Sequence, residues 1–195
     1  VFKSIEDKAT SVPIIGDMIA RRQSEGMEAF NRAAFDEASQ ATGRATSDIG
    51  ENGIRQYQDD IVPEAYNNAL AGRQFQADDQ FSEALQSRMR AATQLPTKVA
   101  EDTGFALREG ISPYVGANGE FNGPQLQKMY QELQSRGSKL GKSQEVSGAD
   151  GAAILRGATN DLGDVVSRQA PDVMPAFRDA NTTFGRGQIL QDAVA

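Results

Sequence analysis

The sequence predicts an all-α fold, and three observations lead to that prediction. Apolar residues recur at intervals of three and four positions along almost the whole chain, which is the helical period. The alternation of Val, Ile, Thr and Tyr that marks strands is missing. The composition is lean, since 38% of the 195 residues are hydrophobic, 7% are aromatic and Trp is absent. We therefore expect an elongated helical array packed through small side chains, with at most one short hairpin.

The chain begins with one short and one long predicted helix. The short helix covers residues 2–10 and ends before Pro13, because proline restricts the residue that precedes it. The long helix runs from about residue 14 to residue 40, and Gly26 predicts a kink within it. Gly43 is a suitable stop signal after this helix.

Three shorter helices are predicted between residues 63 and 110. Pro63 is suited to the first turn of the first helix. Asp78 or Asp79 caps the second helix, and the third covers residues 97–109. The expected buried face of the second helix consists of Phe81, Ala84, Leu85, Arg88, Met89 and Ala92. The expected buried face of the third consists of Val99, Thr103, Ala106 and Leu107.

The clearest loop covers residues 111–123 and is rich in Gly, Pro and Asn. Within it, Asn118-Gly119 is suited to a tight turn between two extended dipeptides, residues 114–115 and 120–121. This is the one short hairpin that the sequence predicts.

Three helices joined by short connections follow the loop. Pro124 opens the first, a polar connector covers residues 141–148, and the second ends at Gln169. Pro171 begins the last helix. Short connections favour antiparallel neighbours, so an antiparallel three-helix bundle is expected. The predicted domains are a long-helix N-terminal array over residues 1–110 and the three-helix bundle over residues 111–195.

The composition excludes several classes of site. The chain has neither Cys nor His, which excludes a disulfide framework, a Cys nucleophile, a structural zinc site and a His-based triad. The net charge of −7 argues against tight, sequence-specific binding of nucleic acid. No stretch approaches the roughly 20 apolar residues of a membrane-spanning helix. We predict no catalytic residue, no cofactor and no metal site.

The string over residues 136–143 ends in Gly-Lys-Ser, like a phosphate-binding loop. That loop needs four residues between its glycines and must follow a strand. Here three residues separate Gly137 from Gly141, and the segment follows a helix, so we interpret it as a helix end and a connector. The pairs Asp59-Asp60 and Asp78-Asp79 do not form a catalytic dyad, because adjacent helical residues point in different directions.

Several segments carry a resemblance to a known family. Residues 11–17 and 28–34 resemble a stretch in large structural proteins of tailed bacteriophages. Residues 123–140, 152–168 and 175–181 are similar to a helix–connector–helix–helix unit in the same proteins. The chain thus resembles the internal virion, or DNA-ejection, proteins of short-tailed phages.

The resemblance implies a structural, non-enzymatic protein that is packaged in the capsid near the portal. It would leave with the genome, enter the host cell envelope and help to form a conduit for DNA. The implied partners are further copies of the chain, the portal and other ejection proteins, with transient and non-specific contact with DNA. Membrane contact would come only through other parts of a longer parent chain. Some members carry a peptidoglycan-cleaving domain, but its Glu-Ser signature does not occur here.

Two alternatives remain open. One is a helical peptidoglycan-cleaving domain with Glu109 or Glu120 as its acid, and the other is a general oligomerising adaptor unrelated to phages. A few bulky residues must also serve several helical faces, so we expect apolar stripes to be covered by other subunits in a ring or tube built from head-to-tail contacts. The candidate interface residues are Ile15, Met18, Ile19, Phe177 and Phe184.

Overall fold

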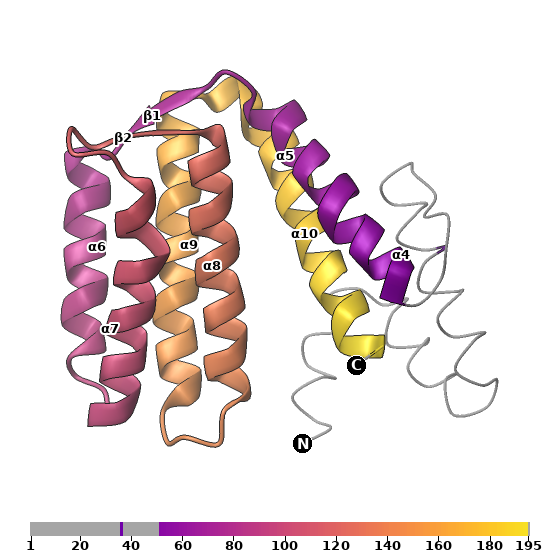
Figure 1. Ribbon diagram of the computed structural model, residues 1–195. Coiled ribbons are helices and arrows are strands. Elements are labelled where there is room, and N and C mark those ends of the chain that lie inside the picture. The colour runs from indigo at the N-terminus through magenta and orange to yellow at the C-terminus, as the bar shows by residue number, and fades with distance from the viewer. Residues whose placement is uncertain (1–35, 37–50, 195) are drawn as a thin grey trace. The chain divides into compact units, whose positions relative to one another are not determined.

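The computed structural model describes residue 36 and residues 51–194, and within these ranges the all-α prediction is confirmed (Figure 1). Apart from Asp36, which is helical, the two helices predicted before residue 43 lie outside the described residues, as do the candidate interface residues Ile15, Met18 and Ile19. The chain divides into two compact units. One is Tyr66–Asp179, and the other combines the described residues 51–65 and 180–194.

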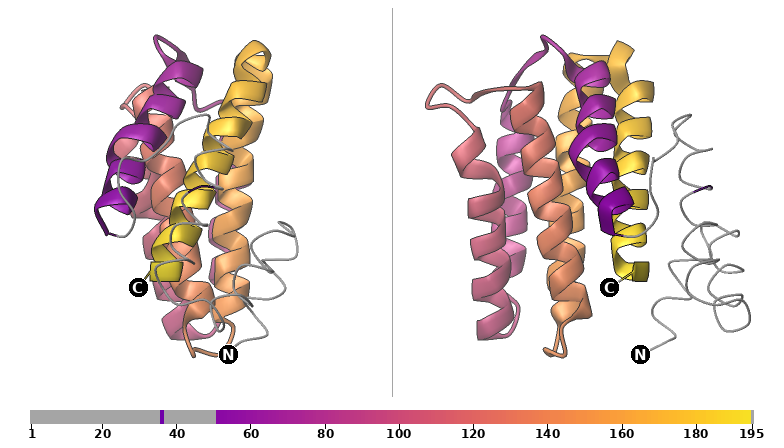
Figure 2. Two further views of the ribbon diagram at one scale, coloured as in Figure 1. Left: turned by 90° about the vertical axis from the view of Figure 1, so that its right-hand side faces the viewer. Right: turned by 45° about the vertical axis from the view of Figure 1, so that its right-hand side comes forward.

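The unit Tyr66–Asp179 is built around four helices in which successive members run in opposite directions (Figures 1 and 2). They are α6 (Asp79–Ala92), α7 (Thr97–Ile111), α8 (Gly123–Lys142) and α9 (Gly148–Gln169). Helix α9 contacts each of the other three. The largest side chains in this core are fully buried, among them Leu107, Leu126, Met129, Leu133, Leu155 and Leu162.

The bundle differs from the predicted three-helix bundle in its membership. Helices α8 and α9 belong to it as expected, but their partners are α6 and α7. The third expected member, α10 (Met174–Val194), is divided between the two units. The domain boundary predicted after residue 110 therefore falls inside a compact unit, because Val99 and Leu107 of α7 are buried in the same core as α8 and α9.

Short polar residues fix where these helices begin. Of the two predicted caps of α6, Asp78 is the one used, and its carboxylate accepts a hydrogen bond of 2.8 Å from the Phe81 N–H. Helix α8 begins with a capping box: Asn122 Oδ1 accepts from the Gln125 N–H, and Gln125 Oε1 accepts from the Asn122 N–H. These bonds satisfy N–H groups that have no partner inside the first turn.

The two short strands form a sheet that the loop chemistry did not predict. Strand β1 (Gln74–Gln76) is antiparallel to β2 (Glu120–Asn122), with Phe75 opposite Phe121. The predicted pairing of residues 120–121 with residues 114–115 was therefore wrong. A 3₁₀ turn covers Ser112–Tyr114 instead, and β2 buries Phe121 in a stacked contact with Phe75, ring centroids 5.7 Å apart.

The second unit contains α4 (Glu51–Gln56), a π-helical turn (Tyr57–Ile61), and parts of α5 (Val62–Leu70) and α10. Pro63 explains the π-helical turn, because it has no N–H for the carbonyl four residues earlier and its ring clashes with that carbonyl. The Val62 N–H bonds to the Tyr57 carbonyl, five residues back.

Tyr57 is a core residue of this second unit. Its side chain is fully buried, and its hydroxyl donates to the Thr183 carbonyl at 3.1 Å. A Cβ on Gly187 would lie 3.1 Å from the Tyr57 ring, so the glycine allows the ring to approach the α10 backbone closely. Burial raises the pKa of Tyr57 to about 12, and Arg186 opposes this shift.

Candidate functional site

Three polar contacts join β1 and the residues beside it to the end of α9 and the turn that follows, and we call them the polar clasp. Arg168 and Asp78 form a two-pronged ion pair with its shortest contact at 2.7 Å. Arg73 forms an ion pair with Asp172, in the 3₁₀ turn Pro171–Val173. The third contact joins the Gln169 side chain to the backbone of Gln76. The clasp therefore connects segments that lie 90 or more positions apart in the sequence.

Gln169 acts as an extra partner for strand β1. Its Oε1 accepts from the Gln76 N–H at 2.8 Å, and its Nε2 donates to the Gln76 carbonyl at 2.7 Å. The side-chain amide thus satisfies backbone groups that the pairing with β2 leaves free. An unpaired strand edge is a template for association with other strands, and this amide covers part of it.

Asp78 is held in its charged form by its neighbours in the clasp. Partial burial acts to raise the pKa of Asp78, but hydrogen bonds from Arg168, the Phe81 N–H and Gln169 together lower it below its usual value. The carboxylate is therefore a cap and an ion-pair partner, and its environment is the opposite of that required for a general acid at neutral pH.

A second ion pair joins α6 to α9. Arg88 Nε lies 3.0 Å from Asp161 Oδ2, and its Nη2 lies 3.1 Å from Oδ1. The hydrogen bonds to Asp161 raise the pKa of Arg88. A Cβ on Gly157 would lie 2.5 Å from the guanidinium carbon, so this glycine makes room for the arginine against α9. Arg88 was predicted on a buried helix face, and the structure places it there as a half-buried charge.

Phe177, one of the predicted interface residues, lies in an aromatic cluster within its own chain. Its ring makes edge contacts with Tyr66 and Tyr130, with centroids 6.2 and 5.9 Å away. Burial raises the pKa of both tyrosines. Phe177 is 1% exposed and Phe184 is 8% exposed, so neither offers an open apolar face to a second subunit. The assignment of these two residues to an intersubunit surface is corrected accordingly.

The other motifs occupy ordinary structural positions. Gly137 is buried in α8 with its Cα facing Leu155, and Lys142 is in the last turn of the same helix, so the Gly-Lys-Ser string is a helix end as predicted. Asp59 and Asp60 are exposed in the π-helical turn.

Glu109 and Glu120, the acids of the alternative enzyme hypothesis, are both exposed. Glu109 lies on α7, and Glu120 lies on β2, where its carboxylate accepts a hydrogen bond from Asn118 Nδ2 at 2.7 Å. Neither side chain is buried in an apolar pocket of the kind that tunes a catalytic acid.

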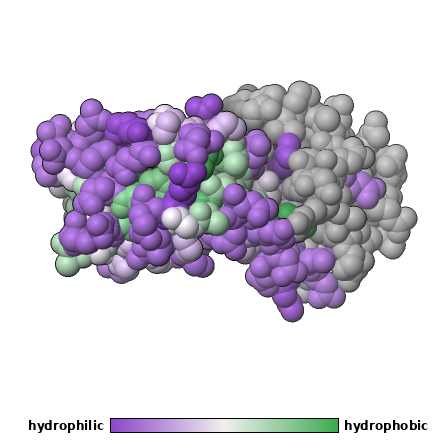
Figure 3. All heavy atoms as spheres, turned by 90° about the horizontal axis from the view of Figure 1, so that it is seen from above, coloured by the Kyte–Doolittle hydropathy of each residue, from purple (hydrophilic) through white to green (hydrophobic). Residues whose placement is uncertain are grey.

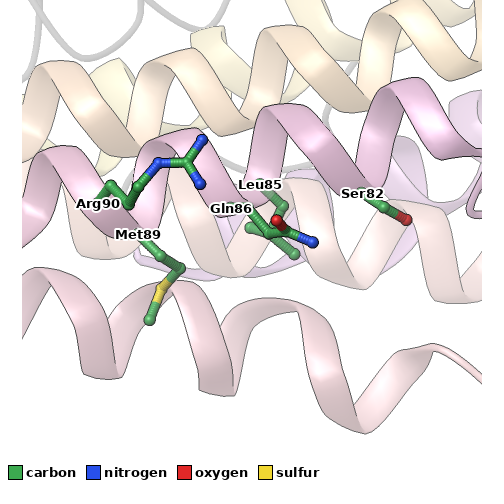
Figure 4. Close-up of a pocket in the computed structure, with 5 residues that line it drawn as sticks. All are labelled: Ser82, Leu85, Gln86, Met89 and Arg90. Atoms are coloured by element: carbon green, nitrogen blue, oxygen red, sulfur yellow. The ribbon is translucent and has the colours of Figure 1, made fainter.

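An open depression lies on the outer side of α6. It has a cavity volume of about 450 Å³, and all the residues that line it belong to this helix: Ser82, Leu85, Gln86, Met89 and Arg90. Figure 4 shows Met89 and Arg90 at one end, Leu85 and Gln86 in the middle and Ser82 at the other end. Leu85 and Met89, predicted to be buried, are half-exposed here.

Phe105 is the most exposed aromatic side chain of the unit Tyr66–Asp179, with 50% of its surface accessible. It projects from α7, and the Arg136 guanidinium of α8 lies 5.4 Å from its ring centroid. Arg136 also pairs with Glu132 at 3.0 Å. Sequence reasoning missed this residue. Phe105 is absent from the apolar stripe of α7 and lies between Glu101 and Glu109, one turn away on each side, and that position was the available signal.

The described surface is otherwise mainly polar. Seen from above, hydrophilic side chains cover most of the described surface, and hydrophobic residues show chiefly in a central area (Figure 3). The exposed large hydrophobic residues among those described are Phe105, Val146 and Ile189. Residues 51–194 contain no helix with the length and apolar character needed to cross a membrane. They also bring together no group of three acidic side chains that could hold a metal ion.

No protein-family model matches this chain, and no curated protein or solved structure is significantly similar to it. The resemblance to phage ejection proteins therefore remains a prediction from the sequence.

Proposed function

We propose that this chain is a structural, non-enzymatic component of a bacteriophage particle that is packaged near the portal and helps to form the conduit for DNA ejection. The observation that carries the proposal is the resemblance over residues 123–140, 152–168 and 175–181. These segments correspond to three consecutive helices, α8, α9 and the beginning of α10.

The use of charged groups in the bundle supports a structural role. The ion pairs Asp78–Arg168, Arg73–Asp172 and Arg88–Asp161 each connect distant parts of the chain. The first two pairs lie at helix ends and connections, and the third joins the interiors of α6 and α9. A protein that carries load in an assembly benefits from such cross-links between segments that are remote in the sequence.

The net charge supports the proposed contact with DNA. With 27 acidic and 20 basic residues, the chain repels phosphate on average, so DNA can pass without strong retention. Partners in this proposal are further copies of the chain, the portal and other ejection proteins. Localisation changes from the capsid interior to the host envelope during infection.

Deletion of the segment that encodes this chain from a phage genome tests the proposal. We expect mutant particles that package DNA and adsorb to cells but fail to deliver the genome, as measured by uptake of labelled DNA. We also expect the purified chain to show no activity in a peptidoglycan-degradation assay. Normal DNA delivery by the deletion mutant, or degradation of the cell wall by the chain, would contradict the proposal.

A further inference from the structure

The unit Tyr66–Asp179 carries an exposed aromatic side chain on one face and an open, partly apolar depression on another. Phe105 projects from α7 where this helix neighbours α8, whereas the depression lies on α6. The two features therefore cannot contact each other within one chain, and each leaves apolar surface in water.

Carboxylates on the Phe105 face and an arginine beside the depression carry opposite charges, and the Arg136 guanidinium that lies over the Phe105 ring is already paired with Glu132. Glu101 and Glu109 lie one turn before and one turn after Phe105, and residues four positions apart share a helix face. No cation among the described residues pairs with either carboxylate. Arg108 on the same helix leans toward Gly104, where its Nη1 would lie 3.5 Å from an added Cβ.

Arg90, at one end of the depression, offers the opposite charge. Within residues 51–194 it has no carboxylate partner, in contrast to Arg88, which pairs with Asp161. Leu85 and Met89 provide the apolar surface beside it. A methionine thioether makes favourable contacts with aromatic rings, and an arginine at the rim pairs with a carboxylate that arrives with the ring.

From this complementarity we propose that the Phe105 face of one copy docks in the α6 depression of a second copy. Phe105 contacts Leu85 and Met89 of its neighbour, and Glu101 or Glu109 pairs with the neighbour's Arg90. The two surfaces are different, so the contact is head-to-tail, and a docked pair still has one Phe105 face and one depression free. Such contacts build rings where the rotation closes and filaments where it does not. The inference rests on the assembling role proposed above and names the surfaces that perform it.

Two single-face variants test the contact by sedimentation velocity over micromolar to millimolar concentrations. Phe105→Asp removes the projecting face, and Met89→Asp removes the depression. Each variant alone is expected to remain monomeric where the wild type forms species larger than dimers. Loss of an aromatic anchor at the centre of an interface weakens association by about tenfold or more.

An equimolar mixture of the two variants gives the most specific result. The Phe105→Asp chain keeps its depression and the Met89→Asp chain keeps its aromatic face, so the mixture should form heterodimers that grow no further. This result also shows that both variants are folded. Arg90→Glu changes an exposed residue and should make the chain associate more weakly than the wild type. Adding Glu101→Arg and Glu109→Arg to the same chain should restore the association.

Val146→Asp is the matched control, because Val146 is 78% exposed in the connection between α8 and α9. It should associate like the wild type. A wild type that stays monomeric at all concentrations would overturn the docking inference. The proposed role in the phage particle is tested separately, by DNA delivery in the deletion mutant. Undiminished association of either single-face variant, or an equimolar mixture without heterodimers, would also overturn the inference.

Discussion

Three glycines of α9 allow the packing of the bundle to be tested by one repeated substitution. Gly151, Gly157 and Gly163 all lie inside the helix. Replacing a helical glycine by alanine stabilises an open site by about 1 kcal/mol, because alanine restricts the unfolded chain and favours the helix. The intrinsic gain is similar at the three positions, so differences among the variants report what the added methyl group meets.

At Gly151 the methyl group would meet three side chains from two other helices. Its Cβ would lie 2.5 Å from Leu140 Cδ2, 2.6 Å from Thr103 Oγ1 and 3.0 Å from Val99 Cγ1. Overpacking of a core costs about 1–3 kcal/mol. We therefore expect Gly151→Ala to lower the free energy of unfolding by about 1 kcal/mol after the helical gain is included.

Gly163 provides the matched control, because nothing lies within 4 Å of its added Cβ. Gly163→Ala should raise the free energy of unfolding by about 1 kcal/mol. Gly157→Ala should fall between the two, since its methyl group meets the guanidinium of Arg88, which can move at the expense of the Arg88–Asp161 pair.

Urea denaturation followed by circular dichroism measures all three variants, with unchanged m-values confirming that the unfolding reaction is the same. The expected order of stability is Gly163→Ala, then Gly157→Ala, then Gly151→Ala. Equal stabilisation by all three substitutions would refute the close approach of α9 to α7 and α8.

Three further predictions concern charge and hydrogen bonding. Asp161→Asn should lower the free energy of unfolding by about 1 kcal/mol, and a double-mutant cycle with Arg88→Met should recover most of this loss as coupling. Asp78→Asn keeps a good helix cap but loses the ion pair with Arg168. Because the folded-state pKa of Asp78 is lowered, the stability that its carboxylate gives the folded protein is present above about pH 4 and is lost as pH falls through that pKa. In urea titrations the variant should therefore be less stable than the wild type at neutral pH and equally stable at strongly acidic pH. The pKa of Tyr57 is raised from 10.0 to about 12, so the stability that its protonated hydroxyl contributes is complete below about pH 10 and is lost as pH rises through 12. Tyr57→Phe should therefore lose less stability than the wild type at alkaline pH. The same loss in both proteins would contradict the buried hydroxyl.

The sequence predicted those features that depend on local spacing. The 3.6-residue period identified α6 to α9, and Asp78 was one of two candidate caps because a carboxylate before an amphipathic run satisfies free N–H groups. The failure at the hairpin has a different origin. Asn118-Gly119 correctly marked a turn, and Gly119 has a φ of +82°, but the partner of β2 lies more than 40 residues earlier in β1.

Burial by remote partners was equally hidden from the sequence. Phe177 was predicted to lie on an uncovered apolar stripe, because the residues that cover it, Tyr66 and Tyr130, come from other helices. Leu85 and Met89 had the spacing of core residues, yet they border an open depression because α6 is covered by α7 and α9 on its other sides. Helical period identifies an apolar face, but the packing of the remaining helices decides how much of that face is buried.

The most direct test of the proposed role compares full phage particles with particles that have ejected their DNA. Quantitative mass spectrometry of purified particles measures the copies of this chain in each. We predict a fixed number of copies per full particle and their loss from emptied particles, in parallel with the DNA. Absence of the chain from full particles, or its complete retention in emptied ones, would contradict the account.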